Sequence, residues 1–255
     1  MTAPKILFYD IETAPNLGYI WGKYEQNVLA YDREWYMLCI SYRWAHEKTT
    51  NVISLRDFPE LYEANPLDDS QLVWTLWNLL DMADITIAHN GDKFDNKKSN
   101  ARFITNGMGP PSPYRSIDTL KVARQKFMFN SNTLGDLGQT LGLGAKVATG
   151  GFELWLGCMR NEDAAWSKMI RYAKQDTVLL EKVYQKLKPW MTNHPNLGMW
   201  SDEEHVCPTC GGTHLTKRGV RRTQTLTYQQ WQCGQCGGYS RSRASEAGPR
   251  PTIVP

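Results

Sequence analysis

The chain has 255 residues, of which 41% are apolar and 22% charged, as in folded globular proteins with one enzyme-sized domain and a small appendage. Its net charge of +3 is too small to argue for a nucleic-acid partner by itself. No apolar run reaches the roughly 18 residues that a membrane-spanning helix needs, and residues 1–12 do not read as a secretory signal peptide. We therefore expect no membrane association and a cytoplasmic location, or the host cytoplasm for a viral protein.

The first half of the chain predicts five β-strands. Residues 5–12 form a continuous apolar run, which is typical of a buried central strand. Residues 36–45 and 50–55 predict two more strands, and the polar turn between them predicts a hairpin. Short strands are also expected at residues 84–88 and 114–119.

Helices are predicted by leucine spacing and by start and stop signals. One helix begins near residues 68–70, and others are expected at 94–106 and about 133–141. The longest runs over residues 163–188 and ends before a proline, while the glycine-rich segment 142–151 predicts a loop.

This order of elements predicts an α/β fold, with a mixed β-sheet flanked by helices, over residues 1–195. Residues 196–206 read as a linker, and residues 207–240 form a compact cysteine-bearing unit. Residues 241–255, rich in Ser, Arg, Gly and Pro, predict a disordered basic tail.

Two carboxylates end the first predicted strand. Asp10 and Glu12 are two positions apart, so both side chains point to the same face of the strand. Carboxylates at the end of a buried strand cost desolvation energy unless a cation compensates them. Mg²⁺ and Mn²⁺ prefer such oxygen ligands, and the pair therefore predicts a divalent-metal site.

Two further carboxylates come from predicted helices. Asp95 opens the helix after the strand at 84–88, where Phe94 is expected to anchor the turn in the core. Tyr172 and Asp176 are four residues apart on the longest helix and therefore share one face. Taken alone, Asp95 also fits a helix cap, Asp176 a solvated helix position and Tyr172 a core aromatic.

Together these motifs resemble the DEDD superfamily of 3′→5′ exonucleases, in its tyrosine-bearing (DEDDy) branch, which includes the proofreading domains of family B DNA polymerases. Asp10-Ile11-Glu12 matches the first motif of that family, Asp-x-Glu. Residues 90–95 match the second, Asn-x-x-x-(Phe/Tyr)-Asp, and residues 172–176 match the third, Tyr-x-x-x-Asp. The first motif is weak alone, but the ordered set is specific, and the resemblance covers roughly residues 5–190.

The resemblance implies a ribonuclease H-like fold and a two-metal mechanism that releases nucleoside 5′-monophosphates from a 3′ end. Asp10 would bridge two Mg²⁺ or Mn²⁺ ions. Glu12 and Asp176 would hold the ion on the nucleophile side, and Asp95 the other through water. Tyr172 would orient the attacking water, because a phenol with a pKa near 10 is a poor base at neutral pH.

Neighbouring residues are weaker candidates. Asn90 and Phe94 of the second motif and Lys146 of the glycine-rich loop are expected to touch the substrate, with a solvated loop lysine as the alternative for Lys146. Asp118 reads as an additional cleft carboxylate or as a cap at a strand end. His89 is expected to be a hydrogen-bonded core histidine rather than a ligand.

The remaining strong signal is a pair of CxxC motifs with 22 residues between them. In a reducing compartment this pattern favours metal over disulfides, although two redox or disulfide pairs are the alternative. We expect a zinc ribbon with one structural Zn²⁺ that supplies its folding energy, and strands at 215–219 and 225–232. The expected ligands are Cys207, Cys210, Cys233 and Cys236.

No acidic residue occurs between Cys207 and Arg243, while basic and aromatic residues are interleaved there. Basic side chains bind phosphates and aromatic rings stack on bases, so this pattern favours nucleic-acid binding. A solvated basic face or a protein-docking ribbon is the alternative. The expected contacts are Lys217, Arg218, Arg221, Arg222, Tyr228 and Trp231.

The expected partner is a nucleic acid with a free 3′ end. Single-stranded DNA is favoured and RNA is the alternative, because the DEDD superfamily contains enzymes for both. A polymerase or a replication or repair complex is a candidate protein partner. A non-catalytic binding or docking scaffold is a further alternative, but such a scaffold has no reason to keep four carboxylates and the tyrosine.

Overall fold

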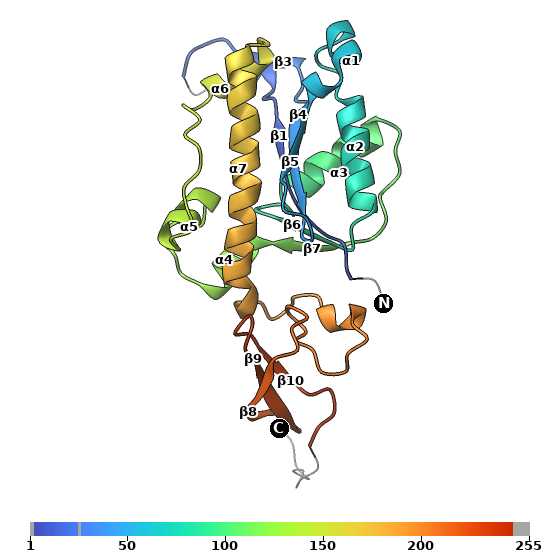
Figure 1. The fold of residues 1–255 in the computed structure, drawn as a ribbon. Coiled ribbons are helices and arrows are strands. Elements are labelled where there is room, and N and C mark those ends of the chain that lie inside the picture. Colours follow the sequence, from blue (N-terminus) through green and yellow to red (C-terminus); the bar gives the residue numbers. More distant parts are fainter. Residues whose placement is uncertain (1–2, 25–26, 247–255) are drawn as a thin grey trace. The chain divides into compact units, whose positions relative to one another are not determined.

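The computed structural model describes residues 3–24 and 27–246 (Figure 1). The chain divides into two compact units. Lys5–Val183 forms the first unit, and the second contains residues 184–246 together with residues 3–4.

A five-stranded mixed sheet forms the centre of the first unit, in the order β5-β4-β1-β6-β7. Its strands are β1 (Ile6–Thr13), β4 (Met37–Trp44), β5 (Asn51–Ser54), β6 (Ile85–Ala88) and β7 (Arg115–Asp118). β1 is antiparallel to β4 and parallel to β6, and this central position explains its continuous apolar run. All five predicted strands are confirmed, as is the hairpin of β4 with β5.

Helices cover both faces of this sheet. Figure 1 shows α7 (Asp163–Leu187) along one face and α2 (Ser70–Asp81) and α3 (Asp95–Thr105) on the other. A hydrogen bond between Ser41 and Thr177 links β4 to α7 in the core. The predicted mixed α/β class is therefore confirmed, with its helices at the expected positions.

Several short elements of the first unit were not predicted. One of them is the helix α4 (Thr119–Lys126). Asp118 caps this helix by accepting hydrogen bonds from two backbone N–H groups. The others are β2 (Leu17–Tyr19), β3 (Ala30–Arg33), η1 (Leu55–Asp57), α1 (Pro59–Ala64) and α6 (Glu153–Met159). The helix predicted at about 133–141 is α5 (Leu134–Thr140).

The second unit contains a three-stranded antiparallel sheet in the order β10-β9-β8. The strands predicted at 215–219 and 225–232 are confirmed as β8 (Leu215–Arg222) and β9 (Thr227–Cys233). A third strand, β10 (Tyr239–Arg241), was not predicted. Two 3₁₀ turns, η2 (Lys188–Trp190) and η3 (Leu197–Trp200), precede this sheet, and η3 lies inside the predicted linker.

The first residues of the predicted tail are ordered rather than free. Arg241 ends β10, and the N–H groups of Ser242 and Glu246 donate to the carbonyls of Gln229 and Thr227 at 2.9 and 2.8 Å. Backbone pairing along β9 therefore outweighs the polar composition of residues 241–246. The rest of the predicted tail, 247–255, lies outside the described residues.

Within residues 3–24 and 27–246, no helix combines the length and the apolar character needed to cross a lipid bilayer.

Candidate functional site

Three predicted acidic residues converge at one place in the first unit. Carboxylate oxygens of Asp10, Glu12 and Asp176 all lie within 4.8 Å of one another. Asp10 and Glu12 come from alternate positions of β1, opposite Ser41 and Cys39 of β4. Asp176 comes from α7 and is almost fully buried. Asp176 thus forms one acidic cluster with Asp10 and Glu12, which lie 164 or more positions before it in the chain.

Asp95 is attached to this cluster through the backbone of β1. Its buried side chain accepts a hydrogen bond from the N–H of Ile11 at 3.1 Å, and Ile11 lies between Asp10 and Glu12. Asp95 is the first residue of α3, whose N-cap position is occupied by Phe94. Asp95 is therefore not the N-cap of α3, which was the alternative interpretation of this residue.

Phe94 does not anchor the turn in the core, so that prediction is wrong. Its side chain is 38% exposed and lies near the ammonium group of Lys98. The turn is shaped instead by Asn90, which adopts a left-handed conformation with φ of 67°. The Asn90 carbonyl accepts hydrogen bonds from the N–H groups of Lys93 and Phe94, and its own N–H donates to Asp118.

Burial and mutual repulsion raise the pKa values of these carboxyl groups. Burial and then the charge of Asp95 raise the pKa of Asp10 well above its ordinary value. Burial and then Asp176 raise the pKa of Glu12 to about 8, and burial raises the pKa of Asp95 to about 7. An ionised cluster of this kind needs a cation beside it.

The donor set fits a divalent cation. All of its side chains are carboxylates, which are the ligands that Mg²⁺ and Mn²⁺ prefer. Among the described residues, the buried Oδ1 atom of Asp176 has no hydrogen-bond partner, although a buried oxygen of this kind normally has one. A metal ion held by Asp10, Glu12 and Asp176 would provide one.

Lys146 reaches into the acidic cluster from the glycine-rich loop. Its ammonium group donates to Oδ2 of Asp176, lies 3.4 Å from the hydroxyl of Tyr172 and sits over the ring of that tyrosine. The solvated-lysine alternative is therefore wrong, because about two thirds of the Lys146 side chain is covered. Burial and then the charge of Glu12 raise the pKa of Tyr172 above the ordinary phenol value.

A cavity of about 440 Å³ lies next to the acidic cluster. Aromatic side chains of Trp35, Phe152 and Trp155 line it, together with Lys98, whose ammonium group sits 3.6 Å from the centre of the Trp35 ring. Trp155 relates the two places, because it lines the cavity and packs edge-on against Tyr172. Thr13, the residue after Glu12, also lines the cavity, so the cavity lies beside the end of β1 that carries Asp10 and Glu12.

The sequence analysis missed Trp35, Lys98 and Phe152. The only local signal was the position of Lys98, one helical turn after Phe94 and Asp95, which places it on the same side of α3. Nothing in the sequence relates Trp35 to Phe152, which follow different elements and meet only in the folded unit.

Two neighbours of the cluster have structural roles. Asp118 Oδ1 accepts from the N–H groups of Asn90 and Leu120 at 2.9 Å, so Asp118 is a cap rather than a member of the acidic cluster. His89 is hydrogen-bonded as predicted, through Nδ1 to Thr119 Oγ1 at 2.9 Å and through Nε2 to the carbonyl of Asn132 at 3.0 Å.

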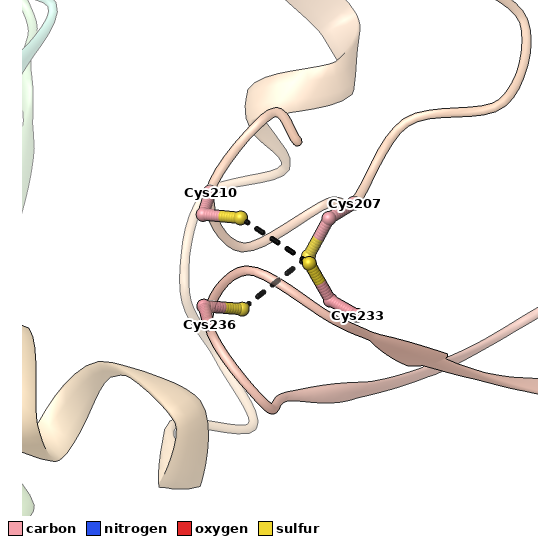
Figure 2. A group of neighbouring side chains, drawn as sticks. All are labelled: Cys207, Cys210, Cys233 and Cys236. Carbon is pink, nitrogen blue, oxygen red and sulfur yellow. Dashed lines mark hydrogen bonds between the residues drawn. The ribbon is translucent and has the colours of Figure 1, made fainter. Parts of the chain in front are cut away.

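The four cysteines of the second unit point toward one another (Figure 2). The Sγ atoms of Cys207 and Cys236 are 3.7 Å apart, and those of Cys210 and Cys233 are 3.6 Å apart. These separations fit tetrahedral Zn²⁺, because Zn–S bonds of about 2.3 Å place neighbouring sulfurs about 3.8 Å apart. They are too long for disulfides. The cluster is thus compatible with a zinc ribbon.

The predicted nucleic-acid contacts of the second unit lie on its sheet. β8 carries the four basic residues, all of them exposed, and β9 carries the two aromatic residues, both partly buried. In order, they are Lys217, Arg218, Arg221 and Arg222, and Tyr228 and Trp231.

Comparison with known proteins supports the fold of the first unit. One similar solved structure is that of the family B DNA polymerase from the hyperthermophilic archaeon Pyrobaculum calidifontis, with a TM-score of 0.53 and 15% sequence identity. The match covers 74% of this chain and 25% of the polymerase chain, so this chain spans about a quarter of that protein. A search of curated protein sequences found no match.

A family model gives the clearest result. The model of the RNase_H superfamily matches residues 7–188, which is more than half of the chain. The matched range contains the five-stranded sheet, α7 and all four carboxylates described above. The chain therefore belongs to the RNase_H superfamily.

Proposed function

We propose that this chain is a metal-dependent 3′→5′ exonuclease of the DEDDy type, which releases nucleoside 5′-monophosphates. The observation that carries the proposal is the convergence of Asp10, Glu12 and Asp176 within 4.8 Å, with Asp95 bonded to the backbone between the first two. Membership of the RNase_H superfamily supports a nuclease, and the ordered motifs support the DEDDy branch.

The four carboxylates and the tyrosine each have a specific role in this proposal. Asp10, Glu12 and Asp176 would hold the divalent cations directly, and Asp95 would hold one of them through water. When bound, Mg²⁺ or Mn²⁺ lowers the pKa of a water molecule and stabilises the leaving oxygen of the phosphodiester. Tyr172 orients the attacking water, and its raised pKa supports this role over proton abstraction.

The substrate proposed is a nucleic acid strand with a free 3′ end, with single-stranded DNA favoured over RNA. The cavity beside the carboxylates supports a terminal nucleotide there, because its aromatic lining provides stacking surfaces for a base and Lys98 provides a cation. The similar structure is a DNA polymerase, which supports DNA and a polymerase or a replication or repair complex as partner. Asn90 and Phe94 lie at the turn that leads to Asp95 and are proposed as further substrate contacts.

The cysteine cluster is proposed to bind one structural Zn²⁺. Four sulfur ligands close a tetrahedral site and leave no open position for catalysis. The zinc ribbon would hold the substrate for the first unit, through basic and aromatic side chains that extend from its sheet.

Digestion of 5′-labelled single-stranded DNA and RNA tests the proposed function. With Mg²⁺ or Mn²⁺, we expect a ladder of products that shortens from the 3′ end and liberates 5′-monophosphates. Asp10→Asn removes a ligand that stabilises the transition state by several kcal/mol and should lower the rate roughly a thousandfold. The faster of the two polymers identifies the substrate class.

Asp92→Asn provides a matched control for Asp95→Asn. Both residues belong to the same motif, but Asp92 bonds Lys121 and Ser116 instead of β1. Only Asp95→Asn should abolish hydrolysis, with both variants folded by circular dichroism. If the wild-type protein binds either polymer tightly and cuts neither, the enzyme proposal is wrong and the chain is a binding scaffold.

A further inference from the structure

The β8–β9 register sorts the basic residues of the zinc ribbon onto two faces of its sheet. Directly paired residues of antiparallel strands share a face, and successive residues alternate. Arg221 pairs with Tyr228 and Arg222 pairs with Thr227, so these two neighbouring arginines point to opposite faces. Lys217 pairs with Trp231, which is three positions from Tyr228 and therefore lies on the face opposite to it.

A β-bulge at Gly219 brings Arg218 and Arg221 to the same face. The register shifts between Lys217 and Val220, and Gly219 has a φ of 74°, which favours glycine. In a regular strand, residues three positions apart would point to opposite faces. With one extra residue in β8, Arg218 lies beside Gln232, to which its Nε donates at 3.1 Å.

The face that contains Tyr228 is rich in arginine. Arg241 of β10 pairs with Gln230, and its guanidinium group lies 3.9 Å from the centre of the Tyr228 ring. We call this surface the arginine face, defined by Arg218, Arg221, Tyr228 and Arg241. Its three guanidinium groups come from two strands that flank β9, so they border the tyrosine on both sides.

Among residues 3–24 and 27–246, no acidic side chain forms an ion pair with the arginines of this face. Residues 207–243 contain no Asp or Glu. The three arginines are exposed, and Tyr228 is partly covered by the arginine stacked on it. Unpaired guanidinium groups beside an aromatic ring are the chemistry that binds phosphates and stacks bases.

The opposite face already has contacts of its own. The ring of His205, from the segment before the first CxxC motif, packs at 6.2 Å from Trp231. The ammonium group of Lys217 also lies over Trp231, at 5.6 Å from the ring centre. The aromatic ring on this side is therefore accompanied by a histidine and one lysine, whereas the arginine face has three guanidinium groups.

We propose that the arginine face binds the sugar–phosphate backbone of a single nucleic acid strand through its exposed guanidinium groups. This inference deepens the proposed nuclease function and rests on it only for the identity of the strand as substrate. It separates the four basic contacts predicted from the sequence: Arg218 and Arg221 contact the strand, whereas Lys217 and Arg222 do not.

Two double variants of β8 test the proposal, because they remove equal charge from opposite faces of one strand. Arg218→Ala/Arg221→Ala alters the arginine face, and Lys217→Ala/Arg222→Ala is the matched control. Both are made in an Asp10→Asn background, and binding of labelled single-stranded DNA and RNA is measured by anisotropy from 50 to 200 mM KCl without added divalent metal. Zinc content shows whether the ribbon has folded.

The slope of log K against log salt is negative, and each lost phosphate contact reduces its magnitude by about 0.7 for a single strand. We therefore expect Arg218→Ala/Arg221→Ala to reduce this magnitude by about 1.4, and the control pair to leave it unchanged. Equal losses from both pairs, or no loss from the first, would overturn the proposal. Arg241→Ala gives an independent answer from β10: it should reduce the magnitude of the slope by about 0.7, and an unchanged slope would contradict the face assignment.

Hydrolysis of a chromogenic nucleotide ester, p-nitrophenyl thymidine 5′-monophosphate, separates this proposal from the nuclease proposal. Arg218→Ala/Arg221→Ala with an intact Asp10 should cleave this small ester at the wild-type rate but shorten long strands more slowly. If the wild-type protein cleaves neither substrate, the nuclease proposal is wrong. The binding measurements alone then decide whether the arginine face contacts a strand.

Discussion

Lys146 places its ammonium group against Oδ2 of Asp176, the carboxylate that α7 contributes to the acidic cluster. The ion pair is largely shielded from water on the Asp176 side, where the side chain is 2% exposed. A divalent cation bound at the free Oδ1 of Asp176 would therefore share this carboxylate with the ammonium group, whose positive charge opposes cation binding.

Replacing this lysine should strengthen metal binding. Lys146→Met keeps most of the side-chain length and removes the charge, so the cluster should bind Mn²⁺ roughly 10- to 100-fold more tightly, since a charged hydrogen bond contributes about 1.5–3 kcal/mol. Titration calorimetry with Mn²⁺ measures this directly. Lys174→Met, at an exposed position of α7, is the control. Unchanged Mn²⁺ affinity in Lys146→Met would show that the ammonium group does not oppose cation binding.

Loss of the Tyr172 hydroxyl should slow hydrolysis without unfolding the protein. Tyr172→Phe retains the ring that packs edge-on against Trp155 and removes only the group proposed to orient water. We expect kcat to fall about 10- to 100-fold, since the lost hydrogen bond is worth about 1.5–3 kcal/mol, with little change in KM. Tyr62→Phe removes a hydroxyl that bonds Asn161 instead and should leave kcat unchanged. Equal kcat values in Tyr172→Phe and wild type would remove Tyr172 from the mechanism.

The stability of the fold should fall in acid because of His89. Burial lowers its pKa to about 4 from an unfolded value near 6.5, so the unfolded chain binds a proton that the folded chain does not. The contribution of neutral His89 is complete above about pH 6.5 and is lost as the pH falls toward 4, by up to roughly 3 kcal/mol. Denaturant unfolding of wild type and His89→Gln between pH 4 and 7 should show a flatter pH dependence in the variant. His46→Gln, at an exposed histidine, should keep the wild-type slope.

Zinc removal should unfold the ribbon. We expect one zinc ion per chain by mass spectrometry, and its loss in Cys236→Ser, because a fourth sulfur then no longer closes the site. Cys158→Ala, at a buried cysteine outside the cluster, should retain the metal. Backbone NMR signals of β8 and β9 report the folding of the sheet. A metal-free protein whose ribbon signals match those of the wild type would rule out a structural role for zinc.

Local periodicity explains which parts of the candidate site could be predicted. Asp10 and Glu12 follow from strand alternation, and Tyr172 and Asp176 from the helical repeat, because each pair lies within one element. The contact of Lys146 with Asp176 joins a loop to a helix 30 residues later, and no repeat relates them. The same holds for Trp35 and Phe152, which only the folded unit brings to one cavity.

Other errors have equally specific causes. Phe94 was expected in the core because it is apolar, but the left-handed turn at Asn90 directs it outward. β2 and β3 are short and largely exposed, so they lack the apolar alternation that marks a half-buried strand. In the ribbon, the bulge at Gly219 changes which arginines share a face, and only the pairing register reveals it.

The central position of β1 determines when the acidic cluster can form during synthesis. β1 is synthesised before its parallel partner β6, because Ile6 pairs with Ile85, 79 residues later. Asp176 arrives only with the second half of α7, after every strand of the first sheet has been made. A nascent chain therefore carries Asp10 and Glu12 without the third carboxylate until 164 further residues have been added. The acidic cluster is completed almost at the end of translation of this unit, and the hydrolysis proposed for it cannot begin before then.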